Sequence, residues 1–123
     1  MAHVLRVEQK GTYLHAVVEG DNTTEDVRQY LAEVRKACEA RGCTRVLVEE
    51  NLRGPSLKTM EIFAIAAGGG SAAAGTLSMV AYMDVNPEHA VRDMQFAENV
   101  AANRGLNVRL FLDRREAEAW LAS

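Results

Sequence analysis

The sequence predicts an α/β protein with a single mixed, mostly parallel five-stranded sheet, an N-terminal antiparallel hairpin and four helices. Three observations predict this fold class. Two strand-like segments at the amino end flank a tight turn. Helical and strand patterns then alternate, which favours parallel pairing with right-handed crossovers. Finally, residues 103–121 contain a helix end, a strand and a capped helix in succession. The expected order is β-β-α-β-α-β-α-β-α, in one domain over residues 1–123.

Hydrophobic periodicity, together with the residues that begin or end helices, predicts nine elements. In chain order they are strands at 3–9 and 12–19, a helix from Thr23 or Thr24 to Gly42, a strand at 45–50, a helix at 56–67, a strand at 77–83, a helix from Asn86 to about 103, a strand at 107–112 and a last helix from Asp113. Lys10 and Gly11 form the hairpin turn. Val27, Tyr30 and Leu31 begin the apolar face of the first helix.

The second half of the chain is marked by turn and cap residues. The run from Gly68 to Gly75, made of glycine, serine and alanine, predicts a flexible loop after the second helix. The strand at 77–83 is apolar on both faces, so a central position with cover above and below is expected. Asn86, followed by Pro87, is expected to cap the third helix.

The last strand and helix have the clearest local pattern. Val108, Leu110 and Leu112 alternate with polar or aromatic residues and are expected on one face of the strand. Asp113 and Glu116 fit a capping box for the helix that follows.

A resemblance to a known family rests on this segment and on the element order. Six residues carry the motif: Phe111, Asp113, Glu116, Ala117, Trp120 and Leu121. The pattern resembles the SpoIIAA-like family, which is related to the STAS domains of anti-sigma-factor antagonists. The resemblance implies a mixed sheet wound with helices, in small bacterial proteins that are mostly non-enzymatic. STAS antagonists carry a phosphorylatable serine in an Asp-Ser-x-Gly motif at the start of the helix after the third strand. Ser56 is the one position here that matches, which makes it the candidate phosphorylation site.

Composition excludes several classes of function. The net charge of −3 is small and both signs are mixed along the chain, so nucleic-acid binding by bulk electrostatics is not expected. No apolar run approaches the roughly 20 residues of a membrane span. Cys38 and Cys43 have neither zinc-site nor redox-pair spacing and are interpreted as reduced. We expect no metal, no cofactor, no enzymatic activity and a cytoplasmic location.

The loops that follow the strands suggest a crevice for an anion or another ligand. In open parallel sheets, ligands bind beyond the carboxyl ends of the strands, where helix N-termini also attract anions. Six side chains are expected there: Asn51, Arg53, Ser56, Lys58, Asp84 and Asn86. The alternative is that polar residues in these loops, Ser56 and Asn86 among them, serve only as helix caps.

The expected helix at 56–67 is apolar in almost every direction around its axis. Such a helix is either deeply buried or covers something besides its own core. A domain with one sheet has little room to enclose it. Met60, Ile62, Phe63 and Ile65 are therefore expected at a subunit interface or in an apolar pocket. The alternative is that the glycine-rich loop folds over them.

These observations favour a small non-catalytic interaction or regulatory module that self-associates, most simply as a dimer, and binds a protein partner. One alternative is a carrier or sensor of an apolar or amphipathic small molecule, because related SEC14-type folds hold lipids. Four methionines would then make an adaptable pocket: Met60, Met79, Met83 and Met94. Another alternative is a phospho-switch at Ser56, where a phosphate would add about two negative charges at a helix N-terminus.

Overall fold

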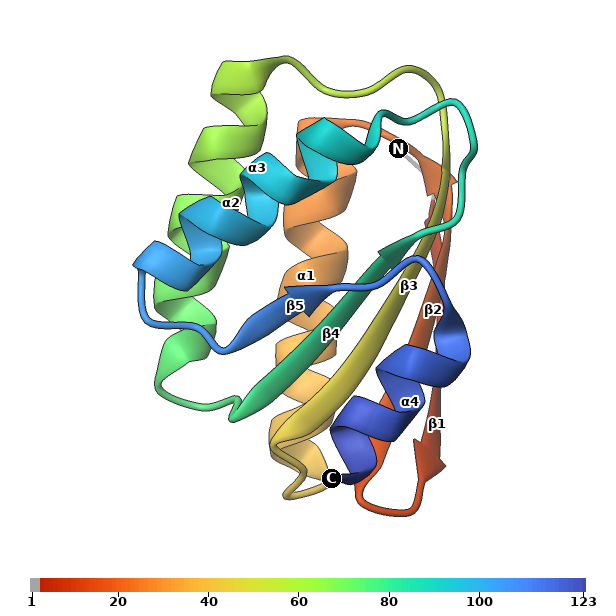
Figure 1. The fold of residues 1–123 in the computed structure, drawn as a ribbon, viewed down its shortest axis with the longest axis vertical. Coiled ribbons are helices and arrows are strands. Elements are labelled where there is room, and N and C mark those ends of the chain that lie inside the picture. Colours follow the sequence, from red (N-terminus) through yellow and green to blue (C-terminus); the bar gives the residue numbers. More distant parts are fainter. Residues whose placement is uncertain (1–2) are drawn as a thin grey trace.

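The computed structural model describes residues 3–123. The elements in chain order are β1 (His3–Lys10), β2 (Tyr13–Asp21), α1 (Thr24–Ala40), β3 (Arg45–Arg53), α2 (Thr59–Ala74), β4 (Met79–Asp84), α3 (Val91–Asn103), β5 (Val108–Leu110) and α4 (Arg114–Ala122). This is the predicted order of strands and helices (Figure 1).

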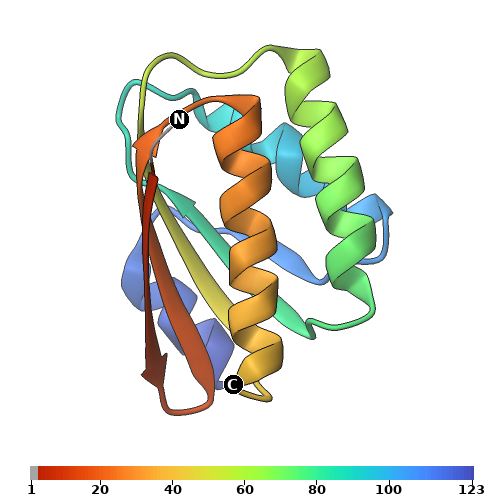
Figure 2. The same cartoon turned by 180° about the vertical axis from the view of Figure 1, so that it is seen from behind.

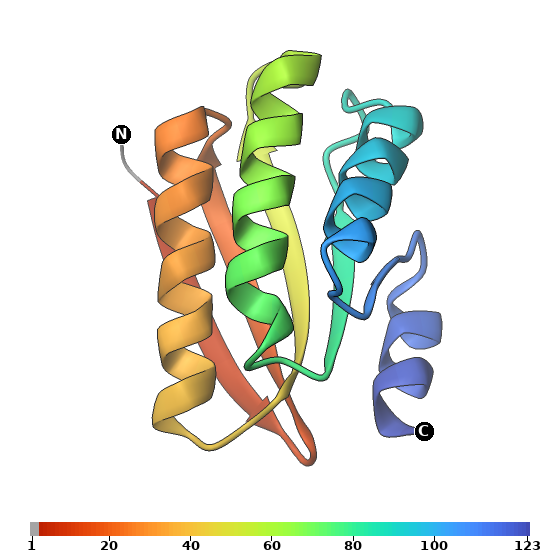
Figure 3. The ribbon, with the colours of Figure 1, turned by 90° about the vertical axis from the view of Figure 1, so that its left-hand side faces the viewer.

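One sheet holds all five strands in the order β1-β2-β3-β4-β5. β1 and β2 are antiparallel, with Gly11 at φ 65° in their turn, and the other pairs are parallel. The predicted mixed, mostly parallel sheet is confirmed. Each right-handed crossover moves one strand further in the same direction, so the crossover helices are expected on one face. Figure 3 shows α1, α2 and α3 side by side there.

The terminal helix α4 covers the opposite face, as the front and rear views show (Figures 1 and 2). It does not connect two parallel strands, so the handedness of crossovers does not require it to lie on the same face as α1, α2 and α3. Ala117 and Leu121 are fully buried there against Leu47 and Ala81 of the sheet. Asp113 caps the helix by accepting a hydrogen bond from the Arg115 N–H, whereas the predicted capping box would have used the N–H of Glu116.

The helix α1 begins as the sequence predicts. The Thr23 side chain accepts a hydrogen bond from the Asp26 N–H. Tyr30, Val34 and Cys38 are buried against the sheet on the same side of the helix. This helix therefore forms one wall of the space between the two layers.

The bounds predicted for the second helix are wrong at both ends. α2 begins at Thr59 rather than at Ser56, and it continues through the glycine-rich run to Ala74. At about 1.5 Å per residue its 16 residues span about 24 Å, which returns the chain along most of β3. Gly70 packs closely against α3, because a Cβ at this position would lie 2.9 Å from the Cα of Ala101.

The predicted cap of the third helix is also wrong. α3 begins at Val91 after Ala90, and Asn86 lies in the preceding turn. The Asn86 side-chain oxygen accepts a hydrogen bond from the Glu88 backbone N–H. The backbone N–H of Asn86 donates a hydrogen bond to the Asp84 carboxylate. These local bonds stabilise a turn, which is the usual alternative to capping for asparagine.

All five strands differ from their predicted bounds by one residue or more, as β3 and β5 illustrate. β3 runs three residues further, to Arg53, and Leu52 is buried in the core. β5 covers only Val108–Leu110, and Leu112 is 68% exposed rather than on the buried face. The chain leaves the sheet after Phe111, whose ring lies 5.6 Å from that of Trp120 on α4.

Across residues 3–123, no helix has the length and apolar character needed to span a membrane.

Candidate ligand-binding site

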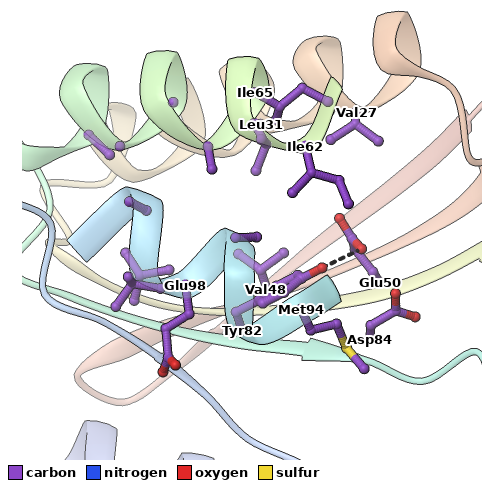
Figure 4. Close-up of a pocket in the computed structure, with 18 of the residues that line it drawn as sticks. Val27, Leu31, Val48, Glu50, Ile62, Ile65, Tyr82, Asp84, Met94 and Glu98 are labelled. Carbon is purple, nitrogen blue, oxygen red and sulfur yellow. Dashed lines mark hydrogen bonds between the residues drawn. The ribbon is translucent and has the colours of Figure 1, made fainter. Parts of the chain in front are cut away.

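A cavity of about 180 Å³ lies between the sheet and the three helices that cover it (Figure 4). Its walls are mainly apolar, and side chains from both layers contribute. Representative lining residues are Val27, Leu31, Val34, Val46, Val48, Ile62, Ile65, Val80, Met94, Leu106 and Val108. A protein interior is normally packed without voids much larger than a water molecule. A hollow of this size is therefore a candidate binding site.

Small residues on α2 and α3 leave this space open. Gly69 and Ala73 of α2 and Ala97 and Ala101 of α3 all line the cavity. The close approach at Gly70 fixes how far these two helices stand apart. Side chains of one carbon or none cannot fill the gap that remains between the helices and the sheet.

One buried carboxyl group, that of Glu50, projects into the cavity from β3. Its two oxygens accept hydrogen bonds from two phenols, Tyr30 on α1 and Tyr82 on β4. The Tyr82 oxygen lies 3.0 Å from Glu50 Oε1. Figure 4 shows Glu50 and Asp84 at one end of the cavity and the aliphatic side chains of α1 and α2 along one side.

Burial decides the protonation of this group. It raises the pKa of Glu50 from 4.5 to about 7, against the lowering effect of the hydrogen bonds from Tyr30 and Tyr82. The nearby Asp84 carboxylate contributes to this rise in the pKa of Glu50, and nearby His89 opposes it. Burial likewise raises the pKa of both tyrosines well above 10, so their hydroxyls remain donors. Within residues 3–123, Glu50 forms no ion pair.

A second polar group closes the same end of the cavity. His89 Nδ1 lies 2.7 Å from Asp84 Oδ2, and its Nε2 lies 2.7 Å from the Gly54 carbonyl oxygen. Both partners are acceptors, so a doubly protonated ring suits both contacts. Burial lowers the pKa of His89, but the bonds to Gly54 and Asp84 outweigh it and the net shift is upward. His89 thus joins the loop after β3 to the loop after β4.

The structure does not bring the six residues of the predicted crevice together. β3 continues to Arg53, and alternation along a strand places successive side chains on opposite faces. Asn51 and Arg53 therefore lie on the face opposite Glu50, where Arg53 pairs with Asp21 at 3.3 Å. Lys58 is exposed just before α2. The prediction of an anion crevice took the last residues of β3 for a loop.

The other three members of that set lie at the cavity end or beside it. Ser56 and Asp84 line the cavity, while the Asn86 amide donates to the Leu52 carbonyl oxygen at 2.8 Å. Ser56 lies three residues ahead of α2, so it neither begins nor caps that helix. Its phosphorylation stays a prediction, without the helix N-terminus that would have favoured a phosphate there.

The four apolar residues predicted for an interface or a pocket divide into two pairs. Ile62 and Ile65 point inward and line the cavity. Met60 is 75% exposed and Phe63 is 40% exposed, on the outer side of the same helix. The guanidinium of Arg104 lies 5.9 Å from the Phe63 ring centroid. An apolar helix in this fold thus contributes both to an internal cavity and to the surface.

Sequence reasoning missed Glu50 as a site residue. The neighbouring residue, Glu49, points to the other face of β3, where it contacts His15 at 2.9 Å on the α4 side. The signal for Glu50 was the alternation that places it on the same face as Val46 and Val48. A carboxyl group on the buried face of a central strand requires partners, and Tyr30 supplies one of them.

A second hollow adjoins the cavity between α1 and α2. It is lined by Arg28, Leu31, Arg35, Ala64, Ile65, Gly68 and Gly69, four of which also line the cavity. Within the described chain, neither arginine forms an ion pair. The positive side chains of this hollow contrast with the carboxyl group at the other end.

The fold is similar to that of a solved structure. That solved structure is the crystal structure of an uncharacterized protein of the DUF3478 family with a SpoIIAA-like fold, from Shewanella loihica. The two chains are 22% identical, with a TM-score of 0.56, and the match covers 97% of this chain and 93% of that chain. The predicted SpoIIAA-like fold is confirmed. No family model matches the sequence, and no curated protein matches it.

Proposed function

We propose that this protein is a non-catalytic, cytoplasmic binding module that holds a small apolar or amphipathic molecule between its sheet and its helices. The observation that carries this proposal is the cavity of about 180 Å³ with largely aliphatic walls and a single carboxyl group bonded to two phenols. Ligand pockets are typically apolar hollows in which a few polar groups fix the orientation of the ligand.

The cavity volume limits the size of the ligand. A protein cavity of about 150 Å³ lined by aliphatic and aromatic side chains binds benzene. The slightly larger cavity here has room for about seven or eight non-hydrogen atoms. A longer ligand would extend into the adjoining hollow between α1 and α2, which shares lining residues with the cavity.

The non-catalytic part of the proposal rests on how the polar groups are used. Each Glu50 oxygen accepts one hydrogen bond from a tyrosine hydroxyl, and Asp84 is bonded to His89. His89 in turn is bonded to the Gly54 carbonyl oxygen. These groups hold one another and the surrounding loops, which favours binding over proton transfer to a substrate. The two free cysteines, Cys38 and Cys43, agree with a reducing compartment.

A matched pair of variants on α3 tests the binding function. Ala97 lines the cavity, whereas Ala102 on the same helix is exposed and does not. The probe is 1-hexanol, titrated into isotopically labelled protein and followed by NMR. We expect Ala97→Phe to fill the cavity and weaken binding by about tenfold or more, while Ala102→Phe changes the affinity by less than about twofold. Equal affinities in the two variants would place the bound alcohol elsewhere and contradict the proposal.

The exposed side of α2 favours self-association as a second candidate function. Met60 and Phe63 are large, apolar and exposed on adjacent turns, and such surfaces often meet a second copy of the chain. We expect sedimentation at increasing protein concentration to show a dimer, and Phe63→Asp to weaken it by about tenfold or more. Glu25→Asp, on the exposed start of α1, is the control. A parent protein that stays monomeric at high micromolar concentration would rule this candidate out.

A further inference from the structure

We infer that the ligand of the cavity carries a protonated amine that pairs with Glu50, with its apolar part lying against Val48, Ile62 and Ile65. This inference rests on the proposed binding function and specifies the chemical class of the ligand. It follows from three features of the cavity: a carboxyl group without a cation, free acceptor positions on that group, and a neighbouring Asp84–His89 pair whose charges balance each other.

The first feature is an unbalanced buried acid. Buried carboxylates in proteins are normally paired with a cation, because removing a charge from water costs several kcal/mol. Within residues 3–123, Glu50 has two neutral phenols as hydrogen-bond partners and no ion pair. A ligand ammonium group would supply the missing positive charge inside the cavity, where an ionic contact is stronger than in water.

The second feature is the remaining hydrogen-bonding capacity of Glu50. A carboxylate has about four lone-pair sites, and the hydroxyls of Tyr30 and Tyr82 use one on each oxygen. About two acceptor sites therefore remain for a donor, and Glu50 lines the cavity. An ammonium group has three N–H donors and no acceptor, so it suits such a site better than a carboxylate or an ether.

The third feature is the pairing of the neighbouring charges. Four titratable side chains face Glu50: Tyr30, Tyr82, Asp84 and His89. Asp84 and His89 lie 2.7 Å apart and balance each other when the histidine is protonated. The tyrosines remain neutral because burial raises the pKa of each well above 10. The charge left at this end of the cavity is that of Glu50 itself.

A ligand whose polar head lay in the hollow between α1 and α2, away from Glu50, would carry a negative charge instead. Arg28 and Arg35 line the hollow between α1 and α2, and an anionic head could sit there with its tail in the cavity. That arrangement would point the apolar tail toward Glu50 and two phenols and leave the buried acid without a cation. The balance of charge favours the amine at Glu50.

Three probes of equal chain length test the inference: hexylamine, 1-hexanol and hexanoate. Their affinities are to be measured by NMR titration near pH 7.5, with parent protein, Glu50→Gln and the control Glu49→Gln on the opposite face. We expect hexylamine to bind about tenfold tighter than hexanol. This ratio should fall to about one in Glu50→Gln and persist in Glu49→Gln. Glu50→Asp, which keeps the acid, should retain part of the preference even if Glu50→Gln does not fold.

Proton release supplies an independent readout. Near pH 6 much of the Glu50 population is protonated, and an ammonium group favours the ionised form. Calorimetry in buffers of different ionisation heat should show release of up to about one proton with hexylamine and none with hexanol. Tighter binding of hexanoate, with loss of that binding in Arg35→Gln, would overturn the inference. Equal affinities would also overturn it and leave the binding function standing. If none of the probes binds, the binding function fails as well.

Discussion

Replacing Gly70 by valine should lower the free energy of unfolding by about 3 kcal/mol. Gly70 is buried where α2 meets α3, and a Cβ there would lie 2.9 Å from the Ala101 Cα and 3.1 Å from its carbonyl oxygen. These neighbours are backbone atoms, so the steric clash can be removed only if the two helices move apart. The separation would also loosen the wall of the cavity, since Gly70 and Ala101 both line it. Urea unfolding at constant pH measures the change.

The same helix provides a matched control. Gly68 is exposed, and a Cβ at that position would meet no atom within 4 Å. Valine has a slightly higher helix propensity than glycine, so Gly68→Val should leave stability unchanged or raise it slightly. The two variants have identical composition and differ only in where the added side chain lies. A loss of stability at Gly70 no larger than at Gly68 would contradict the close packing of α2 on α3.

This packing explains why the end of α2 was predicted incorrectly from the sequence. Consecutive glycines have low helix propensity and normally indicate a loop, which is why Gly68–Gly75 was predicted to be flexible. In the structure, the contact at Ala101 requires a residue without a side chain at Gly70. A tertiary contact between segments 31 residues apart is not visible in local periodicity. Conversely, the first hairpin and the helix capped by Asp113 rest on local signals and were both predicted, although the turn consists of Gly11 and Thr12 rather than Lys10 and Gly11.

The candidate site was predictable only in part. Ile62 and Ile65 were expected in an apolar pocket on the basis of their helix alone, and both line the cavity. Glu50 follows from the strand pattern once β3 is extended to include Leu52, which is buried. The cavity itself depends on the spacing between the helix layer and the sheet. That spacing is set jointly by several helices, so no single segment of sequence encodes it.

Removing the charge of Glu50 should make stability less dependent on pH. The pKa of Glu50 is raised by burial from 4.5 to about 7, so between these values the folded chain binds more protons than the unfolded chain. Stability from this group is therefore greatest below about pH 4.5, falls as the pH rises and levels off above about pH 7. Glutamine carries no charge at either end of this range. It can still accept a hydrogen bond from Tyr30 or Tyr82.

We expect the free energy of unfolding of Glu50→Gln, relative to the parent, to rise by about 2–3 kcal/mol between pH 5 and pH 8. Taking the difference between the two proteins removes the contributions of ionisable groups that do not interact with Glu50. Glu49→Gln, which changes the same residue type on the α4 side of β3, should keep the pH dependence that Glu50 gives the parent. A difference between Glu50→Gln and the parent that stays constant across this range would show that Glu50 ionises as it does in water. The buried acid would then carry no penalty for its charge, and the reason for expecting a cationic ligand beside it would disappear.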